Sequence, residues 1–261
     1  MNAIAFMPDI KYVRSTGSNP VLLLHGFMED NSVWEPLMPW LGEFDLTRID
    51  MPGHGQSPAA PDWNMQHLAR SLEKIILQTF NGPAVVIGHS MGGYAALSLL
   101  AHSPDLVKGV VLLHSHAIAD SPEARNNRLR TISIIEQERT SFITSFFPSL
   151  FAAQNRNRLA NIIEKLKQNS QTISSESIIA ALKAMMERPD SRDVLQKESV
   201  PLLTIWGRDD EKVSEEAVLE TLKASPHSEM LALAGTGHMG MFEAPEKIGP
   251  VIRDFIKRCH S

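Results

Sequence analysis

The sequence predicts an α/β fold, because short apolar runs of the kind found in buried strands alternate with longer segments of helical periodicity. Val21–Leu24 is wholly apolar and Val107–Leu113 nearly so, which is typical of strands covered on both faces of a sheet. A third run, Ala84–Ile87, leads through a glycine-flanked serine at position 90 into a helical pattern at Gly93–Ala101. With 261 residues, 43% of them hydrophobic, the chain is long enough for one large core with a modest insertion.

The remaining elements of the core are expected in order along the chain. Further strands are predicted at Ile10–Ser15, which reads as an edge strand, and at Phe44–Ile49, Val200–Trp206 and Glu229–Ala234. Helices are predicted at Ser32–Leu41, Asn64–Phe80, Ser214–Ala224 and Pro245–Lys257.

Helical periodicity replaces the strand pattern between about residues 118 and 195. Helices are expected from Ser121 to about Glu138, then at Phe142–Phe151, Arg158–Gln168 and Glu176–Arg188. We interpret 118–195 as a helical cap inserted into a core formed by 1–117 and 196–261. The phenylalanines and methionines of this segment fit either the interior of the cap or an apolar wall above a substrate.

Composition and charge exclude several classes of protein. The formal net charge of −5 and the pI near 6.1 lack the basic excess that binding to a nucleic-acid backbone requires. The single cysteine, Cys259, has no partner for an internal disulfide, which favours a reducing compartment. The N-terminal residues lack the features of a signal peptide and no window is long enough for a membrane span, so a cytoplasmic protein is expected. The sequence does not indicate an oligomeric state.

Ser90 lies in the motif Gly88-His-Ser-Met-Gly92, between a strand and a helix. This pattern indicates a nucleophile elbow, in which a sharp turn presents the serine hydroxyl and a side chain at either flanking glycine would collide with the neighbouring chain. The backbone N–H of Met91 would then face a developing oxyanion from the start of the helix. The N–H of Phe27, which follows the strand ending in His25-Gly26, is the second candidate donor. Such a site is suited to acyl transfer.

Carboxylate and imidazole partners for this serine are expected after the last two strands. Asp209 and Asp210 follow the strand at 200–206, and His238 follows the strand at 229–234 on a glycine-rich loop. Other histidines are interpreted differently. His54 is expected to be structural, because it precedes the serine and lies within a turn. His114 and His116 could ligate a metal, but pocket lining or packing is favoured, and no metal is expected.

The residues that carry these signals resemble the α/β-hydrolase superfamily. They are His25-Gly-Phe27, Asp50-Met-Pro-Gly-His-Gly-Gln-Ser57, Gly88-His-Ser-Met-Gly92, Gly207-Arg-Asp-Asp210, and Gly237-His238 followed by Glu243-Ala-Pro245. The resemblance implies a mostly parallel sheet flanked by helices, a cap over the active site and a catalytic triad in the chain order Ser, Asp, His. It selects Ser90, Asp210 and His238, leaves Asp209 as a turn residue, and implies an oxyanion hole at Phe27 and Met91. It requires no cofactor.

The chemistry expected from this resemblance is hydrolysis of carboxylic esters of small to medium, mainly apolar compounds through an acyl-enzyme. Two alternatives stay open on the same triad, namely a carbon–carbon bond hydrolase and a thioesterase. A non-catalytic receptor for a small molecule is a third. Arg125, Arg128 and Arg130 are expected to be solvated on one helix, the alternative being a clamp for a substrate carboxylate.

Overall fold

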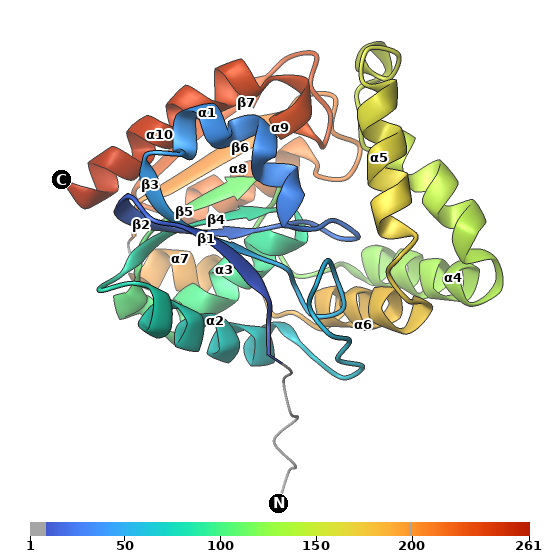
Figure 1. Cartoon of the computed structure of the whole chain (residues 1–261), viewed down its shortest axis with the longest axis horizontal. Helices are drawn as coiled ribbons and strands as arrows, with labels where there is room; N and C mark the ends of the chain where they lie inside the picture. The colour runs from blue at the N-terminus through green and yellow to red at the C-terminus, as the bar shows by residue number, and fades with distance from the viewer. Residues whose placement is uncertain (1–8, 199) are drawn as a thin grey trace, which may run out of the picture.

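The computed structural model describes residues 9–198 and 200–261, which are built around a central sheet (Figure 1). Within these residues the sheet has seven strands in the spatial order β1-β3-β2-β4-β5-β6-β7. All neighbouring pairs run parallel except β1, which pairs antiparallel with β3 at one edge. The α/β fold with a mostly parallel sheet is therefore confirmed. The strands are β1 (Tyr12–Ser15), β2 (Ser18–Leu24), β3 (Phe44–Ile49), β4 (Ala84–His89), β5 (Val107–Leu113), β6 (Leu202–Gly207) and β7 (Ser228–Leu233).

Helices cover both faces of the sheet. Helices α1 and α10 contact each other on one face, and α2 and α3 pack together on the other (Figure 1). The α-helices are α1 (Met38–Leu41), α2 (Met65–Thr79), α3 (Met91–His102), α4 (Pro122–Ser149), α5 (Ala160–Ser170), α6 (Ser175–Met186), α7 (Arg192–Glu198), α8 (Glu215–Ala224), α9 (Gly240–Glu243) and α10 (Pro245–His260). Short 3₁₀ helices span Asn31–Leu37, Pro104–Leu106 and Ala153–Asn155.

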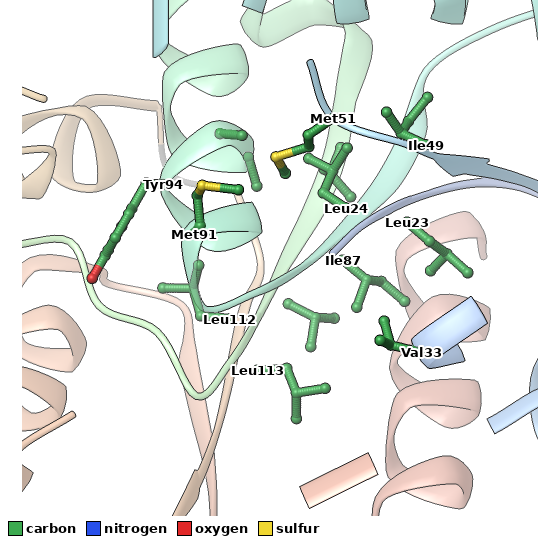
Figure 2. Close-up of a cluster of buried hydrophobic side chains, with 14 of the residues drawn as sticks. Leu23, Leu24, Val33, Ile49, Met51, Ile87, Met91, Tyr94, Leu112 and Leu113 are labelled. Atoms are coloured by element: carbon green, nitrogen blue, oxygen red, sulfur yellow. The ribbon is translucent and has the colours of Figure 1, made fainter. Parts of the chain in front are cut away.

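The core lies against the central strands, where apolar side chains of β2, β4 and β5 meet the start of α3 (Figure 2). Leu24, Ile87, Met91 and Leu112 are fully buried, and so is every residue of β4. Full burial of one such side chain contributes about 1.5–3 kcal/mol to the free energy of unfolding. The turn between β4 and α3, which carries Ser90, is therefore mounted on fully buried residues of the core.

The segment predicted as one helix at Ser32–Leu41 is instead a 3₁₀ helix, Asn31–Leu37, followed by the single turn of α1. Pro36 lies inside the 3₁₀ helix and Pro39 is the second residue of the α-helical turn. A proline ring clashes with the carbonyl four residues earlier and offers no N–H, so a continuous α-helix across both prolines is disfavoured. The tighter winding of the first part is the result.

Helices α4, α5 and α6 lie together to one side of the sheet and form the segment expected to be the cap (Figure 1). Helix α4 has a kink at Glu138, whose φ of −142° and ψ of 53° are not helical, and this is where the first predicted cap helix ends. Helix α7, which was not predicted, contacts α3 and α8 of the core. The expected boundary at residue 195 falls inside this helix.

Two expectations concern export and membranes. Among the described helices, none is both long enough and apolar enough to cross a membrane. The expectation about a signal peptide rests on residues 1–8, which lie outside the described part of the chain.

The glycines that flank Ser90 allow backbone segments to touch. A Cβ atom at Gly92 would lie 2.0 Å from the Leu24 carbonyl oxygen, and one at Gly88 would lie 2.2 Å from the Gly92 oxygen. Backbone atoms held in a packed sheet have no room to move aside. The collision expected from the sequence is therefore confirmed at both positions.

We expect Gly92→Ala to lower the free energy of unfolding by about 3 kcal/mol, because the added methyl group overlaps the end of β2. Gly82→Ala is the matched control, since a Cβ at Gly82 meets no atom within 4 Å, and its effect should stay within about 0.5 kcal/mol. Urea unfolding of both variants measures the difference. Equal stabilities of the two variants would contradict the assignment of a close approach at Gly92.

Candidate active site

Ser90 occupies a strained turn between β4 and α3. Its φ of 50° and ψ of −113° are unusual for a residue with a side chain, and its N–H donates to the Leu113 carbonyl at 3.0 Å. Residues held in such conformations persist only where the surrounding structure fixes them, and they cluster at functional sites. The turn places the serine beyond the end of the strand, so the hydroxyl faces away from the packed sheet.

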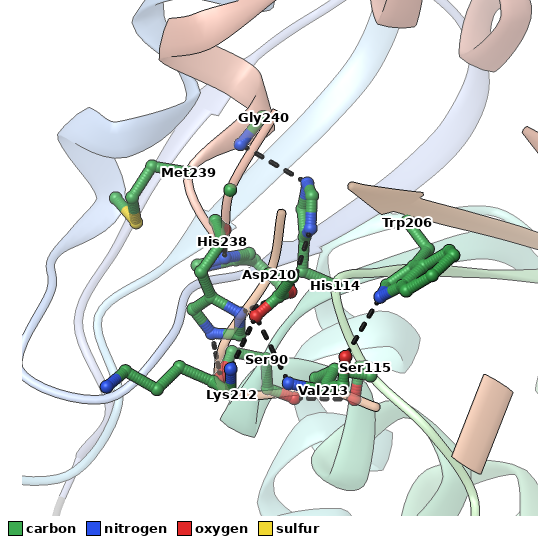
Figure 3. A network of polar contacts seen from close by, with 12 residues as sticks. Ser90, His114, Ser115, Trp206, Asp210, Lys212, Val213, His238, Met239 and Gly240 are labelled. Atoms are coloured by element: carbon green, nitrogen blue, oxygen red, sulfur yellow. Dashed lines mark hydrogen bonds and ion pairs between the residues drawn. The ribbon is translucent and has the colours of Figure 1, made fainter. Parts of the chain in front are cut away.

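His238 and Asp210 continue from Ser90 as a hydrogen-bonded series (Figure 3). The Ser90 hydroxyl lies 2.9 Å from His238 Nε2, and His238 Nδ1 lies 2.8 Å from Asp210 Oδ2. Because a carboxylate only accepts, Nδ1 carries a proton and Nε2 is free to accept the serine hydroxyl proton. The structure thus brings together the three residues expected from the sequence.

Asp210 is held as an ionised acceptor. Its Oδ1 accepts the backbone N–H groups of Lys212 at 2.8 Å and Val213 at 3.1 Å, and its Oδ2 also accepts His114 Nδ1 at 3.2 Å. Burial alone would raise the pKa of Asp210, but His238 and the hydrogen bonds from both histidines lower it well below its usual range. The neighbouring Asp209 is exposed and accepts from Gln154 instead.

The two candidate oxyanion donors lie on adjacent segments. Contact of Gly92 with the Leu24 carbonyl brings the chain after β2 against the first turn of α3. Phe27 belongs to that chain and lines one cavity together with Ser90. Within the described residues, the backbone N–H groups of Phe27 and Met91 have no hydrogen-bond acceptor, so both are available to a bound group.

A buried ion pair beneath the site was not predicted. Glu29 Oε2 accepts the Gly26 N–H at 2.7 Å and contacts His89 Nδ1 at 2.9 Å, while His89 Nε2 donates to the His238 carbonyl at 2.9 Å. Since both partners of the His89 ring are acceptors, the ring is an imidazolium. Burial would lower the pKa of His89, but the charge of Glu29 more than offsets burial and raises it. The pair ties three loops together, those of Gly26, Ser90 and His238.

His114 supports Asp210 from the end of β5. The residue is fully buried with a φ of 50°, and its Nε2 accepts the Gly240 N–H at 3.2 Å. With Nδ1 donating to Asp210, the ring is neutral, and burial lowers its pKa to about 4. His114, Asp210 and His238 are also close enough to share a metal ion, but the ligand atoms are those already used in these hydrogen bonds.

Glu243 fastens the His238 loop to the base of the cap. Its carboxylate accepts the N–H groups of Gly237 at 2.9 Å and Ala152 at 3.0 Å. The N–H of His238 itself donates to the Leu150 carbonyl at 2.7 Å. The sequence shows Glu243 only as part of a motif, because nothing local reveals which distant amides it will accept.

His54 and His116 lie outside the series that contains Ser90. His54 is fully buried with Nδ1 bonded to the Pro52 carbonyl, and burial lowers its pKa to about 3. His116 contacts the Tyr94 hydroxyl through Nε2 at 3.2 Å, and its Nδ1 accepts the Ile118 N–H. Both rings are neutral and engaged in local packing, as the sequence predicted for His54.

A cavity of about 440 Å³ lies between Ser90, His238 and the cap. Its apolar wall includes Phe27, Phe142, Phe146, Leu150, Leu182 and Met185. All three cap arginines were expected to be solvated, and this expectation is wrong for Arg128. Arg125 and Arg130 are exposed, but Arg128 lines the cavity with a side chain that is 21% exposed. The reason is its place on the inward face of α4.

Comparison with known proteins agrees with the fold. A sequence model of the alpha/beta hydrolase fold family matches residues 19–245. The chain therefore belongs to the α/β-hydrolase family.

Among solved structures, the malate-bound esterase of Thermogutta terrifontis is similar with a TM-score of 0.90 and 30% identity, covering 97% of this chain and 94% of that one. The 2-(acetamidomethylene)succinate hydrolase of Mesorhizobium japonicum is 26% identical, covering 94% of this chain and 90% of that protein. Lipase LipV of Mycobacterium tuberculosis is 36% identical over a shorter match, which spans 45% of this chain and 46% of the lipase.

We expect Glu29→Gln to lower the free energy of unfolding by about 3 kcal/mol near pH 6, because it leaves the buried imidazolium of His89 without its counter-ion. His89 has a raised pKa, so its contribution is complete below about pH 6.5 and is lost as the pH rises through that raised value. Glu29 has a lowered pKa, so its contribution is lost as the pH falls below about 4.5.

The destabilisation by Glu29→Gln should therefore be largest between about pH 4.5 and 6.5 and smaller at pH 9. Urea unfolding at pH 6 and pH 9 measures this difference, with Glu216→Gln on the exposed start of α8 as the control. A loss that is equal at both pH values would show that the pair is not ionised as described.

Proposed function

We propose that the protein hydrolyses small to medium carboxylic esters through an acyl-enzyme formed on Ser90. The observation that carries this proposal is the continuous hydrogen-bonded series from the Ser90 hydroxyl through His238 to Asp210. Its position at the floor of a cavity with an apolar wall supports a substrate that places its carbonyl at Ser90 and its chains against the aromatic rings. Similarity to an esterase along nearly the whole chain adds support.

In the first half of the proposed reaction, Ser90 Oγ attacks the ester carbonyl carbon while His238 Nε2 takes the hydroxyl proton. Asp210 keeps the imidazole in the required tautomer and stabilises the imidazolium that forms. The N–H groups of Phe27 and Met91 stabilise the negative oxygen of the tetrahedral intermediate. The bond to the alcohol oxygen then breaks, and His238 returns its proton to the leaving alkoxide.

In the second half, a water molecule attacks the acyl carbon and gives a proton to His238. Collapse of the second intermediate returns that proton to Ser90 Oγ and releases the carboxylic acid. Every proton moves through one imidazole, so the geometry of His238 governs both halves. This is why the fixation of its loop by Glu29–His89 and by Glu243 matters for the rate.

A second candidate is hydrolysis of another bond, a thioester or an activated carbon–carbon bond, on the same three residues. The relative from Mesorhizobium japonicum matches 94% of this chain and is named a hydrolase and not an esterase, which leaves cleavage of a bond other than an ester open. Assays with a nitrophenyl ester, a thioester and a β-diketone of similar size would separate the two. Turnover of the ester alone supports the first proposal.

Ser90→Ala should reduce the hydrolysis of nitrophenyl butanoate roughly a thousandfold or more, because the nucleophile is lost and only the oxyanion donors remain. The free energy of unfolding should change by less than about 0.5 kcal/mol, since the hydroxyl leaves no core cavity. Steady-state kinetics and urea unfolding on the same preparation provide the two measurements. Retention of most of the activity would exclude Ser90 as the nucleophile.

Asp210→Asn should slow the reaction roughly a thousandfold or more, because an amide NH₂ facing His238 Nδ1 favours the wrong tautomer. Asp209→Asn is the adjacent control, and its effect should be far smaller because Asp209 is exposed and contacts Gln154. Comparison of kcat for the two variants is the test. The opposite ranking would exchange the roles of the two aspartates.

A further inference from the structure

Helix α4 presents one face to the cavity above Ser90. Ala124, Asn127, Arg128 and Thr131 line it, and their spacing of three and four residues is that of one helix face. Arg128 is the strongly polar member of this face. Its guanidinium is mostly buried at the boundary of the cavity that also contains Ser90 and His238.

Arg128 belongs to a buried cluster that carries a net positive charge. Both Arg128 and Arg188 pair with the single carboxylate of Asp120, and the side chains of Asp120 and Arg188 are each 4% exposed. Two guanidinium groups therefore share one counter-ion. A buried charge without its own counter-ion is costly, so the cluster favours binding of a further anion.

Arg128 and Arg188 differ in how many of their guanidinium N–H donors already have a good acceptor. Arg188 also donates to the Met185 and Ile118 carbonyls and stacks over the Tyr94 ring at 3.7 Å from its centroid. Arg128 Nε and Nη2 donate to Asp120, whereas Nη1 has the Met185 sulfur at 3.4 Å. A thioether is a weak acceptor. Burial would lower the pKa of Arg128, but Asp120 and the Tyr94 hydroxyl, with which the guanidinium also interacts, raise it. Arg128 Nη1, which has no strong acceptor, and the adjacent Tyr94 hydroxyl are therefore the groups in this cluster that a bound anion would engage.

Tyr94 supplies a second donor, four residues after Ser90 on α3. His116 is a neutral imidazole, because burial first and Arg188 second lower its pKa to about 4. Its Nδ1 accepts from Ile118, so Nε2 carries the proton and donates to the Tyr94 hydroxyl. The hydroxyl proton of Tyr94 has no acceptor among the described residues, and Tyr94 lines the cavity.

Elsewhere in the cavity lining, the acidic Glu211 and the basic Lys212 are adjacent and exposed, so they add no net charge. The positive character of the cavity therefore lies at the α4 side. The same cavity that contains Ser90 also has apolar walls, which fit a short hydrocarbon chain.

We infer that Arg128 and Tyr94 form a subsite for a carboxylate group of the substrate, so that the preferred esters are monoesters of dicarboxylic acids. This inference rests on the proposed function. A carboxylate would accept charge-assisted hydrogen bonds from Arg128 Nη1 and the Tyr94 hydroxyl and would neutralise the cluster. The expectation of solvated arginines and mainly apolar substrates is thereby replaced at one end of the cavity.

The test compares the monomethyl ester of glutaric acid with its neutral amide isostere. Wild-type kcat/KM should favour the acid roughly 10- to 100-fold, as two hydrogen bonds to a charged group predict. Arg128→Gln and Tyr94→Phe should each reduce this ratio at least about fivefold, mainly through a higher KM for the acid. Arg125→Gln, an exposed arginine one turn earlier on the same helix, should keep the wild-type ratio.

Tyr94→Phe keeps the pairing of Asp120 and decides the outcome where Arg128→Gln does not fold, as thermal unfolding would reveal. A wild-type ratio near one, or variants of Arg128 and Tyr94 indistinguishable from Arg125→Gln, would overturn the subsite. Hydrolysis of the neutral ester would then still support the proposed function.

If neither ester is cleaved, the ester function fails, and calorimetry with glutarate tests the subsite alone. Binding that Arg128→Gln weakens at least about tenfold supports the subsite, and the absence of glutarate binding overturns it.

Discussion

Direct backbone contact between the end of β2 and the first turn of α3 is the constraint on which the candidate site depends. The contact exists because Gly92 has no side chain, and it holds the chain that contains Phe27 beside the turn that contains Ser90. The parallel register places Leu24 opposite Gly88, so the two strand ends are level. Side chains packed on both faces keep this register, because a shift would disrupt the close packing of these buried side chains.

Around the contact between β2 and α3, buried carboxylates hold in place the loops that are not fixed by apolar packing. Glu29 joins the loops of Gly26 and Ser90, Asp210 joins β5 to the His238 loop through His114, and Glu243 joins that loop to the cap. Each carboxylate is buried, and each accepts two or more donors. A buried anion is tolerable only with such partners, so the loops cannot move independently without exposing an unpaired charge.

The strands and the order of the candidate site residues could be predicted from sequence because both are local signals. Phe44–Ile49 and Val107–Leu113 were predicted with the observed bounds. Placement of Asp210 and His238 after strands followed from topology, since parallel strands end at one edge. The pairing of Glu29 with His89, sixty residues apart, depends on the folded arrangement and has no signature in the local pattern.

The cap was harder to interpret for a related physical reason. Three arginines at positions 125, 128 and 130 form one local charge pattern, yet only one of them faces inward. Which face of α4 points inward is decided by packing against α5 and α6 and by the kink at Glu138. A helix with such mixed polarity does not show its buried face by periodicity alone.

Hydrogen bonds of the Leu150 and Ala152 backbone link the His238 loop to the cap. Proteins that share one fold carry different functions on it, so the parts added to the sheet decide specificity. In this chain residues 150–155, which follow α4 within the cap, hold the His238 loop through Leu150, Ala152 and Asn155. A chimaera in which the cap is replaced only up to residue 149 keeps these hydrogen bonds. One in which it is replaced up to residue 155 loses them together with α4.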